Sequence, residues 1–204
     1  MGTKRASLVQ QRQSPLRDRY RSVPAEAWIT DSAETVNACG GDPFHGAVVP
    51  ANGDASLRFG IHRAVGGFHD YPNPGDLLSA ALAACFDSTL RMLADHLGIR
   101  LESLEVKVDA ECDVRGCLLV ERTVPVGFQR MRCRVRLQPK DDVDEETVQM
   151  LVAAAEKSCV VLQTLRNGVT VQAEIQADRP GALRVAETAV GASPSPAGKS
   201  DGAA

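Results

Sequence analysis

The stretch from residue 73 to residue 98 decides the fold of this chain, and it reads NPGDLLSAALAACFDSTLRMLADHLG. Asn73 is a favoured N-cap residue, Pro74 suits the first helical position, and Asp76 completes a pattern like a capping box. Leucine, alanine and Cys85 then recur at helical spacing until Gly98, which favours the end of a helix. A helix that is apolar around so much of its circumference is typical of a buried central element.

A second helix is predicted from about Asp144 to Ser158, because apolar residues recur there at helical spacing. We expect a further helical segment to start at this point, with Ser158 as its N-cap and Cys159 in its first turn. Cys85 and Cys159 would then both lie on apolar helix faces. Such a thiol is usually inert packing, but two of them can form a redox couple in which one attacks and the other resolves.

Alternating apolar and polar residues predict the strands of the chain. The long candidates cover residues 102–112, 130–137 and 168–176, and the short ones cover residues 34–39, 45–49 and 56–62. Each long strand would bury one face, so we expect Cys112 and Cys133 to point into the core.

The strand at residues 130–137 carries an arginine at every second position. These arginines could form a phosphate-binding stripe, but a neighbouring strand carries acidic residues at the same spacing, which favours cross-strand ion pairs. A zinc site made of Cys112, Cys117 and Cys133 is not expected, because the spacing is loose and no histidine lies near them in the sequence.

Composition and charge are those of an ordinary water-soluble protein. Hydrophobic residues make up 44% and charged residues 24% of the 204 residues, and the net charge is −3, so we expect no nucleic-acid partner. The chain shows no uninterrupted apolar run of membrane-span length and no apolar signal segment at its start, so we expect a cytoplasmic protein without a membrane partner. One domain is expected at residues 24–178, between disordered tails at residues 1–22 and 180–204.

The run from Asn73 to Cys85 resembles the signature of the osmotically inducible protein C family, OsmC/Ohr. In that family an Asn-Pro-Glu-Glu-Leu-Leu-like turn opens a central helix that bears the reactive cysteine. The segment Lys157-Ser-Cys-Val160 is similar to the family's second-cysteine segment, and the order of elements matches over residues 33–176. The resemblance implies an α+β fold with antiparallel sheets packed around two central helices, and an intertwined homodimer.

The same resemblance implies an antioxidant stress-response enzyme that reduces organic hydroperoxides with thiols and uses no metal or cofactor. Cys85 would attack the peroxide, Cys159 would resolve the resulting sulfenic acid, and an external dithiol would reduce the disulfide. Only a thiolate attacks efficiently, and Cys85 lies too far along its helix to use the N-terminal dipole. In the family an arginine supplies the cation; Arg63 is the first candidate and Arg58 the second. The residues expected to line the substrate site are Phe68, His69, Tyr71, Asp76 and Phe86.

The sequence departs from the family pattern at two positions. Gly75 stands where the family has its catalytic glutamate, and Val160 replaces the proline that commonly follows the second cysteine. Asp76 comes one position after Gly75, and we interpret it first as a helix cap. A second function therefore stays open: an OsmC-like dimer without peroxidase activity that binds a small hydrophobic ligand, with Cys85 as part of the pocket wall.

Overall fold

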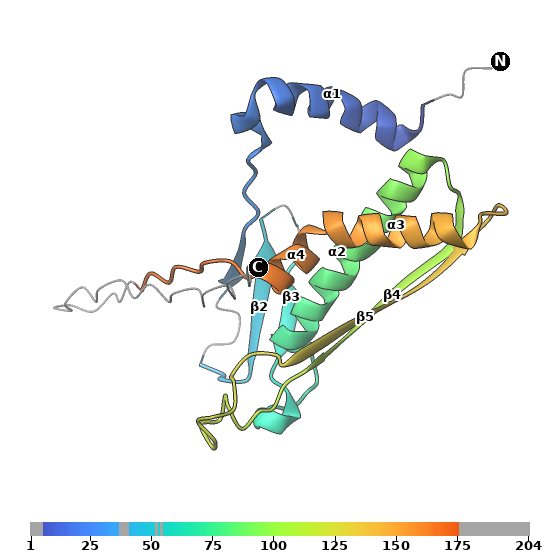
Figure 1. Cartoon of the computed structure of the whole chain (residues 1–204). Helices are drawn as coiled ribbons and strands as arrows, with labels where there is room; N and C mark the ends of the chain where they lie inside the picture. Colours follow the sequence, from blue (N-terminus) through green and yellow to red (C-terminus); the bar gives the residue numbers. More distant parts are fainter. Residues whose placement is uncertain (1–5, 37–40, 52, 54, 176–204) are drawn as a thin grey trace, which may run out of the picture.

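The computed structural model describes residues 6–36, 41–51, 53 and 55–175, and it is an α+β structure with two antiparallel sheets (Figure 1). The first sheet has the strand order β1-β2-β3, and the second is the long hairpin β4-β5. These strands are β1 (Ala33–Val36), β2 (His45–Pro50), β3 (Leu57–Gly60), β4 (Leu101–Glu111) and β5 (Arg130–Pro139). The predicted α+β class and five of the six predicted strands are therefore confirmed, apart from residues 37–39 of the first strand, which lie outside the described residues.

Helix α2 (Pro74–Leu97) is the central element, and its ends are those that the sequence predicts. The Asn73 side chain accepts hydrogen bonds from the backbone N–H groups of Gly75 and Asp76, and the Asp76 carboxylate accepts one from the Asn73 backbone. Gly98 ends the helix in the left-handed conformation, at φ 75°, where glycine carries no steric penalty.

Helices α3 (Glu145–Ser158) and α4 (Val160–Asn167) pack on α2, and they meet at a bend of 64°. Cys159 lies at this bend in an extended conformation and is at once the C-cap of α3 and the N-cap of α4. The predicted break is confirmed, but its predicted cap is wrong. Ser158 belongs to α3 because its hydroxyl donates to the carbonyl of Ala154, at 2.7 Å, within that helix.

The core lies where α2, α3 and β4 meet. Its buried residues are Leu82, Phe86, Leu90, Ala94, Leu104, Leu151, Ala155 and Cys159. The inward side chains of β5, Cys133 among them, pack against this cluster. Cys112 does not, contrary to expectation: it is exposed because β4 ends at Glu111.

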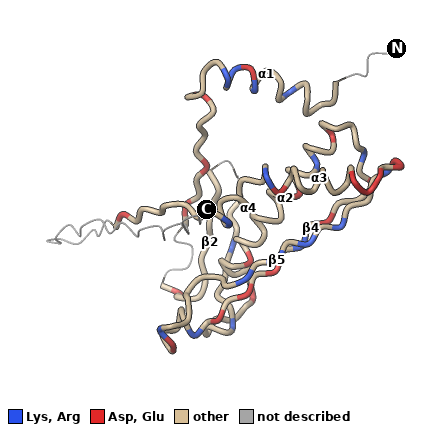
Figure 2. The backbone as a smooth tube through the Cα atoms, viewed as in Figure 1, with Lys and Arg blue, Asp and Glu red and all other residues tan. Residues whose placement is uncertain are grey.

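Three of the four arginines of β5 form cross-strand ion pairs, which confirms the structural interpretation of the alternating arginines. The register places Arg136 opposite Glu105 and Arg130 opposite Glu111, with ion pairs of 3.7 and 2.9 Å. Arg134 pairs with Asp109 across the same hairpin. Acidic and basic residues accordingly follow one another along β4 and β5 in Figure 2.

Two expectations about the ends of the domain are not met. Residues 168–175, predicted as a strand, have no regular secondary structure, and Val169, Val171 and Ile175 are 68%, 68% and 75% exposed. A strand needs a neighbouring edge, and the described part of this chain supplies none to that segment. Residue 176 and the expected C-terminal tail lie outside the described residues.

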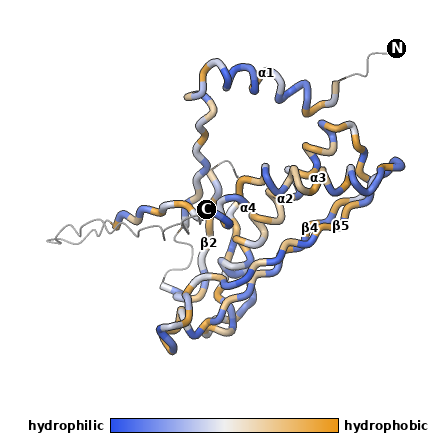
Figure 3. Tube along the Cα trace, viewed as in Figure 1, coloured by the Kyte–Doolittle hydropathy of each residue, from blue (hydrophilic) through white to orange (hydrophobic). Residues whose placement is uncertain are grey.

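At the other end, part of the segment expected to be disordered forms helix α1 (Leu8–Ser22). Ser7 and Gln10 make a capping box, and the Asp95 carboxylate near the end of α2 accepts from the Val9 backbone N–H at 2.8 Å. The Gln10 side chain also donates to the carbonyl of His96. Helix α1 is mainly hydrophilic and buries none of its own residues (Figure 3). Its sequence therefore lacks the apolar periodicity that predicts a packed helix.

Much apolar surface remains uncovered in a single chain. Helix α2 is long and apolar enough to cross a membrane by length and composition alone, a test that core helices also pass, yet only 28% of its most apolar window is buried. Trp28 and Ile29, between the short 3₁₀ helix η1 (Pro24–Ala27) and β1, are 87% and 77% exposed. We propose that a second copy of the chain covers this surface, and that the alternating residues 169–175 find their strand partner there.

The dimer predicts a mass in solution of twice the 21.7 kDa of one chain. Multi-angle light scattering at micromolar concentration measures this directly. A stable monomer would contradict the prediction. Replacement of Trp28 by lysine, which places a charge in the proposed contact while leaving the core cluster unchanged, should shift the equilibrium toward the monomer.

Candidate functional site

The two cysteines singled out by the sequence lie side by side in the folded chain. The Sγ atoms of Cys85 and Cys159 are 3.3 Å apart, although the residues are 74 positions apart in the sequence. Cys85 comes from the middle of α2, and Cys159 from the bend between α3 and α4. The prediction that both helices turn their thiols into one interior is therefore confirmed, and a disulfide would need the sulfurs to approach to about 2.05 Å.

The environments of the two thiols differ. Cys159 is 0% exposed, whereas Cys85 is half-buried. Burial raises the pKa of the Cys159 thiol, and the neighbouring Cys85 raises it further, while backbone N–H groups at the start of α4 act in the opposite direction. The Cys159 thiol accordingly keeps its proton and donates it toward the Cys85 sulfur. This asymmetry makes Cys85 the accessible thiol and Cys159 the protected one.

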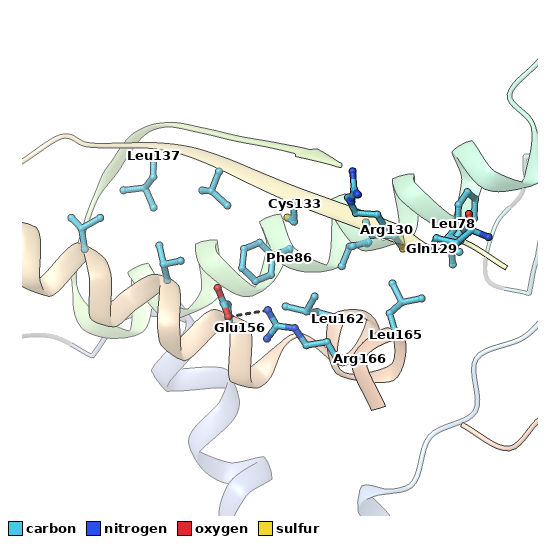
Figure 4. Close-up of a pocket in the computed structure, with 16 residues that line it drawn as sticks. Leu78, Phe86, Gln129, Arg130, Cys133, Leu137, Glu156, Leu162, Leu165 and Arg166 are labelled. Carbon is cyan, nitrogen blue, oxygen red and sulfur yellow. Dashed lines mark hydrogen bonds and ion pairs between the residues drawn. The ribbon is translucent and has the colours of Figure 1, made fainter. Parts of the chain in front are cut away.

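A cavity of about 900 Å³ has a lining of mixed polarity, which includes residues close in sequence to both cysteines but neither cysteine itself. It opens between α2, β5 and the α3–α4 bend, and Phe86 and Leu162 extend into it from the two cysteine-bearing segments (Figure 4). Arg166 and Glu156 form an ion pair of 3.1 Å between α4 and α3 at one side of the cavity. Of the five residues expected to bind substrate, Phe86 is the one that lines this cavity.

Cys133 on β5 also lines this cavity, as Figure 4 shows. Burial raises the pKa of its thiol, the negative charge of Glu156 adds to the effect, and Arg166 opposes it. At neutral pH this thiol is therefore protonated, which suits a role in the wall of the cavity rather than as a nucleophile.

The opposite side of α2 borders a second cavity, of about 750 Å³, into which Gly75 and Asp76 face. A Cβ atom placed on Gly75 would lie 2.9 Å from Cζ of Phe128, so an aromatic ring occupies the space where a longer side chain would begin. Asp76, expected near the substrate, uses its carboxylate to cap α2. Cys112 and Cys117 line this second cavity, on the other side of α2 from the cavity that Cys133 lines.

The two arginines proposed as the cation lie in the segment before α2. Arg63 is exposed in the short 3₁₀ helix η2 (Arg63–Val65), and the Arg58 guanidinium lies 4.4 Å from the centroid of the Tyr71 ring. In the part of the chain that the structure describes, neither arginine makes an ion pair or a hydrogen bond with Cys85 or Cys159. The role of Arg63 therefore stays a prediction.

The remaining predicted residues belong to the loop that leads into α2. His69 adopts φ 57° and contacts His62, with ring centroids 4.4 Å apart. Phe68 and Tyr71 instead pack around His45, a residue that the sequence did not single out. The partners of His45 are Asp42 and Asp70. Because Asp70 lies 25 positions after His45 in the sequence, no local motif predicts this cluster.

Differential labelling tests the asymmetry of the thiol pair. In the folded, reduced protein at neutral pH, iodoacetamide should label Cys85 well before Cys159, because Cys159 is buried and its raised pKa leaves little thiolate. Labelling of Cys159 should rise only at a pH above that needed for an ordinary cysteine. Peptide mass spectrometry resolves the sites, with exposed Cys112 and the unfolded protein as references, and equal rates at Cys159 and Cys112 would contradict the asymmetry.

Comparison with solved structures gives the same fold at low sequence identity. An organic hydroperoxide resistance protein OsmC from Legionella pneumophila is 23% identical, with a TM-score of 0.52 over 69% of this chain and 91% of that one. An OsmC-like protein from Mycoplasma pneumoniae is 13% identical, with a TM-score of 0.55 over 69% of this chain and 89% of that one. An organic hydroperoxide resistance protein from Elizabethkingia anophelis is 22% identical, with a TM-score of 0.52 over 70% and 92%.

No curated protein matches this chain. The sequence model of one family, described as OsmC-like protein, matches residues 67–174, more than half of the 204 residues. That match spans α2, the β4-β5 hairpin, both C-terminal helices and both cysteines of the thiol pair. The expected family is therefore confirmed: the chain belongs to the OsmC-like protein family.

Proposed function

We propose that this protein is a thiol peroxidase that reduces organic hydroperoxides, with Cys85 as the attacking thiol and Cys159 as the resolving one. The observation that carries the proposal is the 3.3 Å separation of the two sulfurs, with one thiol half-buried and the other fully buried. Membership of the OsmC-like family supports the same chemistry, and two of the similar structures are named organic hydroperoxide resistance proteins.

The reaction balances with the residues present and one external reductant. The Cys85 thiolate attacks the terminal oxygen of the hydroperoxide, the O–O bond breaks, and the products are a Cys85 sulfenic acid and an alkoxide that takes up a proton as alcohol. The Cys159 sulfur then attacks the Cys85 sulfur, water leaves with the Cys159 proton, and a disulfide forms. An external dithiol reduces this disulfide by exchange and is itself oxidised, which returns both thiols.

The apolar side chains of the 900 Å³ cavity support a substrate that carries a hydrocarbon part. They include Leu82, Phe86 and Leu162, each close in sequence to one of the two cysteines. Apolar surface of this kind favours the hydrocarbon part of an organic hydroperoxide over hydrogen peroxide, which has no apolar part to bury. We propose Arg63 as the cation that assists the Cys85 thiolate, delivered by the loop before α2.

Substitution of the cysteines separates the steps. Cys85→Ser should abolish the consumption of cumene hydroperoxide, because a serine hydroxyl does not cycle through a sulfenic acid. Cys159→Ser should consume one equivalent and then stop, because no thiol resolves the intermediate. Arg63→Ala should slow the first step and leave resolution unchanged. Stopped-flow measurement of hydroperoxide consumption, with a dithiol reductant in excess, gives all three results.

Cys112→Ser is the matched control, because it removes an exposed thiol outside the core cluster that holds both cysteines of the pair, and it should leave turnover unchanged. Circular dichroism confirms that each variant is folded. If the wild type consumes no alkyl hydroperoxide with any dithiol, or if Cys85→Ser equals the wild type, the peroxidase proposal fails. Binding of a hydrophobic ligand in the cavity would then be the function to test.

A further inference from the structure

A histidine held between two carboxylates joins the first sheet to the loop before α2. His45, the first residue of β2, has its Nδ1 2.5 Å from Oδ2 of Asp42, and its Nε2 3.0 and 3.1 Å from the two carboxylate oxygens of Asp70. Asp42 belongs to the turn before β2, and Asp70 to the loop at residues 66–73. The His45 side chain is only 16% exposed.

This geometry determines the charge of the ring. A neutral imidazole has one N–H donor and one acceptor nitrogen, whereas an ionised carboxylate only accepts. When both aspartates are ionised, both hydrogen bonds can therefore form only if His45 is the imidazolium. The hydrogen bonds to Asp42 and then Asp70 raise the pKa of His45, and the bond from His45 lowers the pKa of Asp42. For Asp70, desolvation acts to raise the pKa, and the bond from His45 helps to outweigh it, so that this pKa too is lowered.

Aromatic rings enclose the histidine. The Phe68 ring stacks on His45 with centroids 5.7 Å apart and planes 7° apart, and Tyr71 meets it edge-on at 5.8 Å. Arg58 on β3 lies over the Tyr71 ring, with its guanidinium carbon 4.4 Å from the ring centroid. The titratable and charged groups around His45 are therefore Asp42, Asp70, Tyr71 and Arg58, and the ionised aspartates favour its positive charge.

The loop held in this way is the one that leads into the candidate site. It carries Phe68, His69 and Tyr71 and ends at Asn73, the N-cap of α2. Backbone hydrogen bonds tie it to the first sheet and the residues that follow: Gly60 N–H donates to Pro72, and His69 N–H to Ile61, at 3.0 and 3.1 Å. The link through His45 is a further contact of this loop, and it depends on a charge that titrates in the physiological pH range.

We propose that His45 is a positioning residue whose imidazolium, bridging Asp42 and Asp70, fixes the loop at residues 66–73 and releases it when the ring loses its proton. Because the folded-state pKa of His45 is raised, the bridge is complete below the ordinary histidine pKa and is lost as the pH rises through the raised value. The lowered pKa values of Asp42 and Asp70 set the acid limit, below which the carboxylates take up protons. An effect of the loop on hydroperoxide turnover rests on the proposed function, whereas the bridge itself does not.

Nuclear magnetic resonance of the histidine side chains tests the bridge without any assay of activity. In a titration of the full chain, His45 should keep both ring protons above pH 6.5, the ordinary value. Asp70→Asn and Asp42→Asn should each move its transition to lower pH. The matched control is His69→Asn, which removes a histidine from the same loop and keeps a residue that tolerates positive φ; it should leave the His45 transition unchanged.

Hydrogen exchange then tests positioning. His45→Gln keeps a donor toward Asp70 but has no charge, so amide exchange in the loop at residues 66–73 should accelerate about tenfold, as for the loss of one charged hydrogen bond. The wild type should show the same acceleration only above the His45 transition, and His45→Gln should show no such pH dependence. A His45 transition at or below 6.5, or unchanged exchange in His45→Gln, would overturn the proposal.

The pH profile of turnover connects the bridge to the site. If the wild type reduces hydroperoxide, His45→Gln should remove the alkaline limb that follows the His45 transition. A protein that shows the expected titration and exchange but reduces no hydroperoxide would refute the proposed function and support the bridge. A protein that reduces hydroperoxide but lacks the shifted titration of His45 would support the proposed function and refute the bridge.

Discussion

The packing of α2 against the bend between α3 and α4 is the constraint on which the rest of the site depends. It buries Cys159 completely and places its sulfur 3.3 Å from that of Cys85. The same contact encloses Leu82, Phe86 and Leu151 in one core, and Leu82 and Phe86 also line the 900 Å³ cavity. Core packing and candidate chemistry are therefore carried by the same residues, so substitutions here must be conservative in volume to separate the two.

The elements that bury one face were predictable from the sequence, and those that depend on other partners were not. The caps and the apolar face of helix α2 predict that helix, and strict alternation with matched charges predicts the β4-β5 hairpin. Residues 168–175 alternate in the same way but pair with no strand edge within the described chain. Alternation indicates that one face of a segment is to be buried, but it does not indicate which element covers that face. Helix α1 could have been recognised only from the capping pair Ser7 and Gln10.

The site was predictable to a similar extent. Two cysteines on apolar helix faces were enough to predict that their side chains converge, since both faces must share the single core. The environment of the thiols was harder to predict, because it depends on contacts between segments far apart in the sequence. The Phe128 ring covers Gly75 from across the fold, and His45 meets Asp70 through a loop whose path no local pattern records. The capping role of Asp76, by contrast, follows from its position three residues after Asn73.

The central claim is that Cys85 and Cys159 form a redox couple, and non-reducing peptide mapping after exposure to one equivalent of cumene hydroperoxide tests it most directly. The reduced protein is treated, its remaining thiols are alkylated, and the digested peptides are identified by mass spectrometry. The account predicts one linked species that joins the peptides containing Cys85 and Cys159, with Cys112, Cys117 and Cys133 recovered as alkylated thiols. Recovery of Cys85 and Cys159 both unlinked, or linkage of Cys85 to a different cysteine, would contradict it.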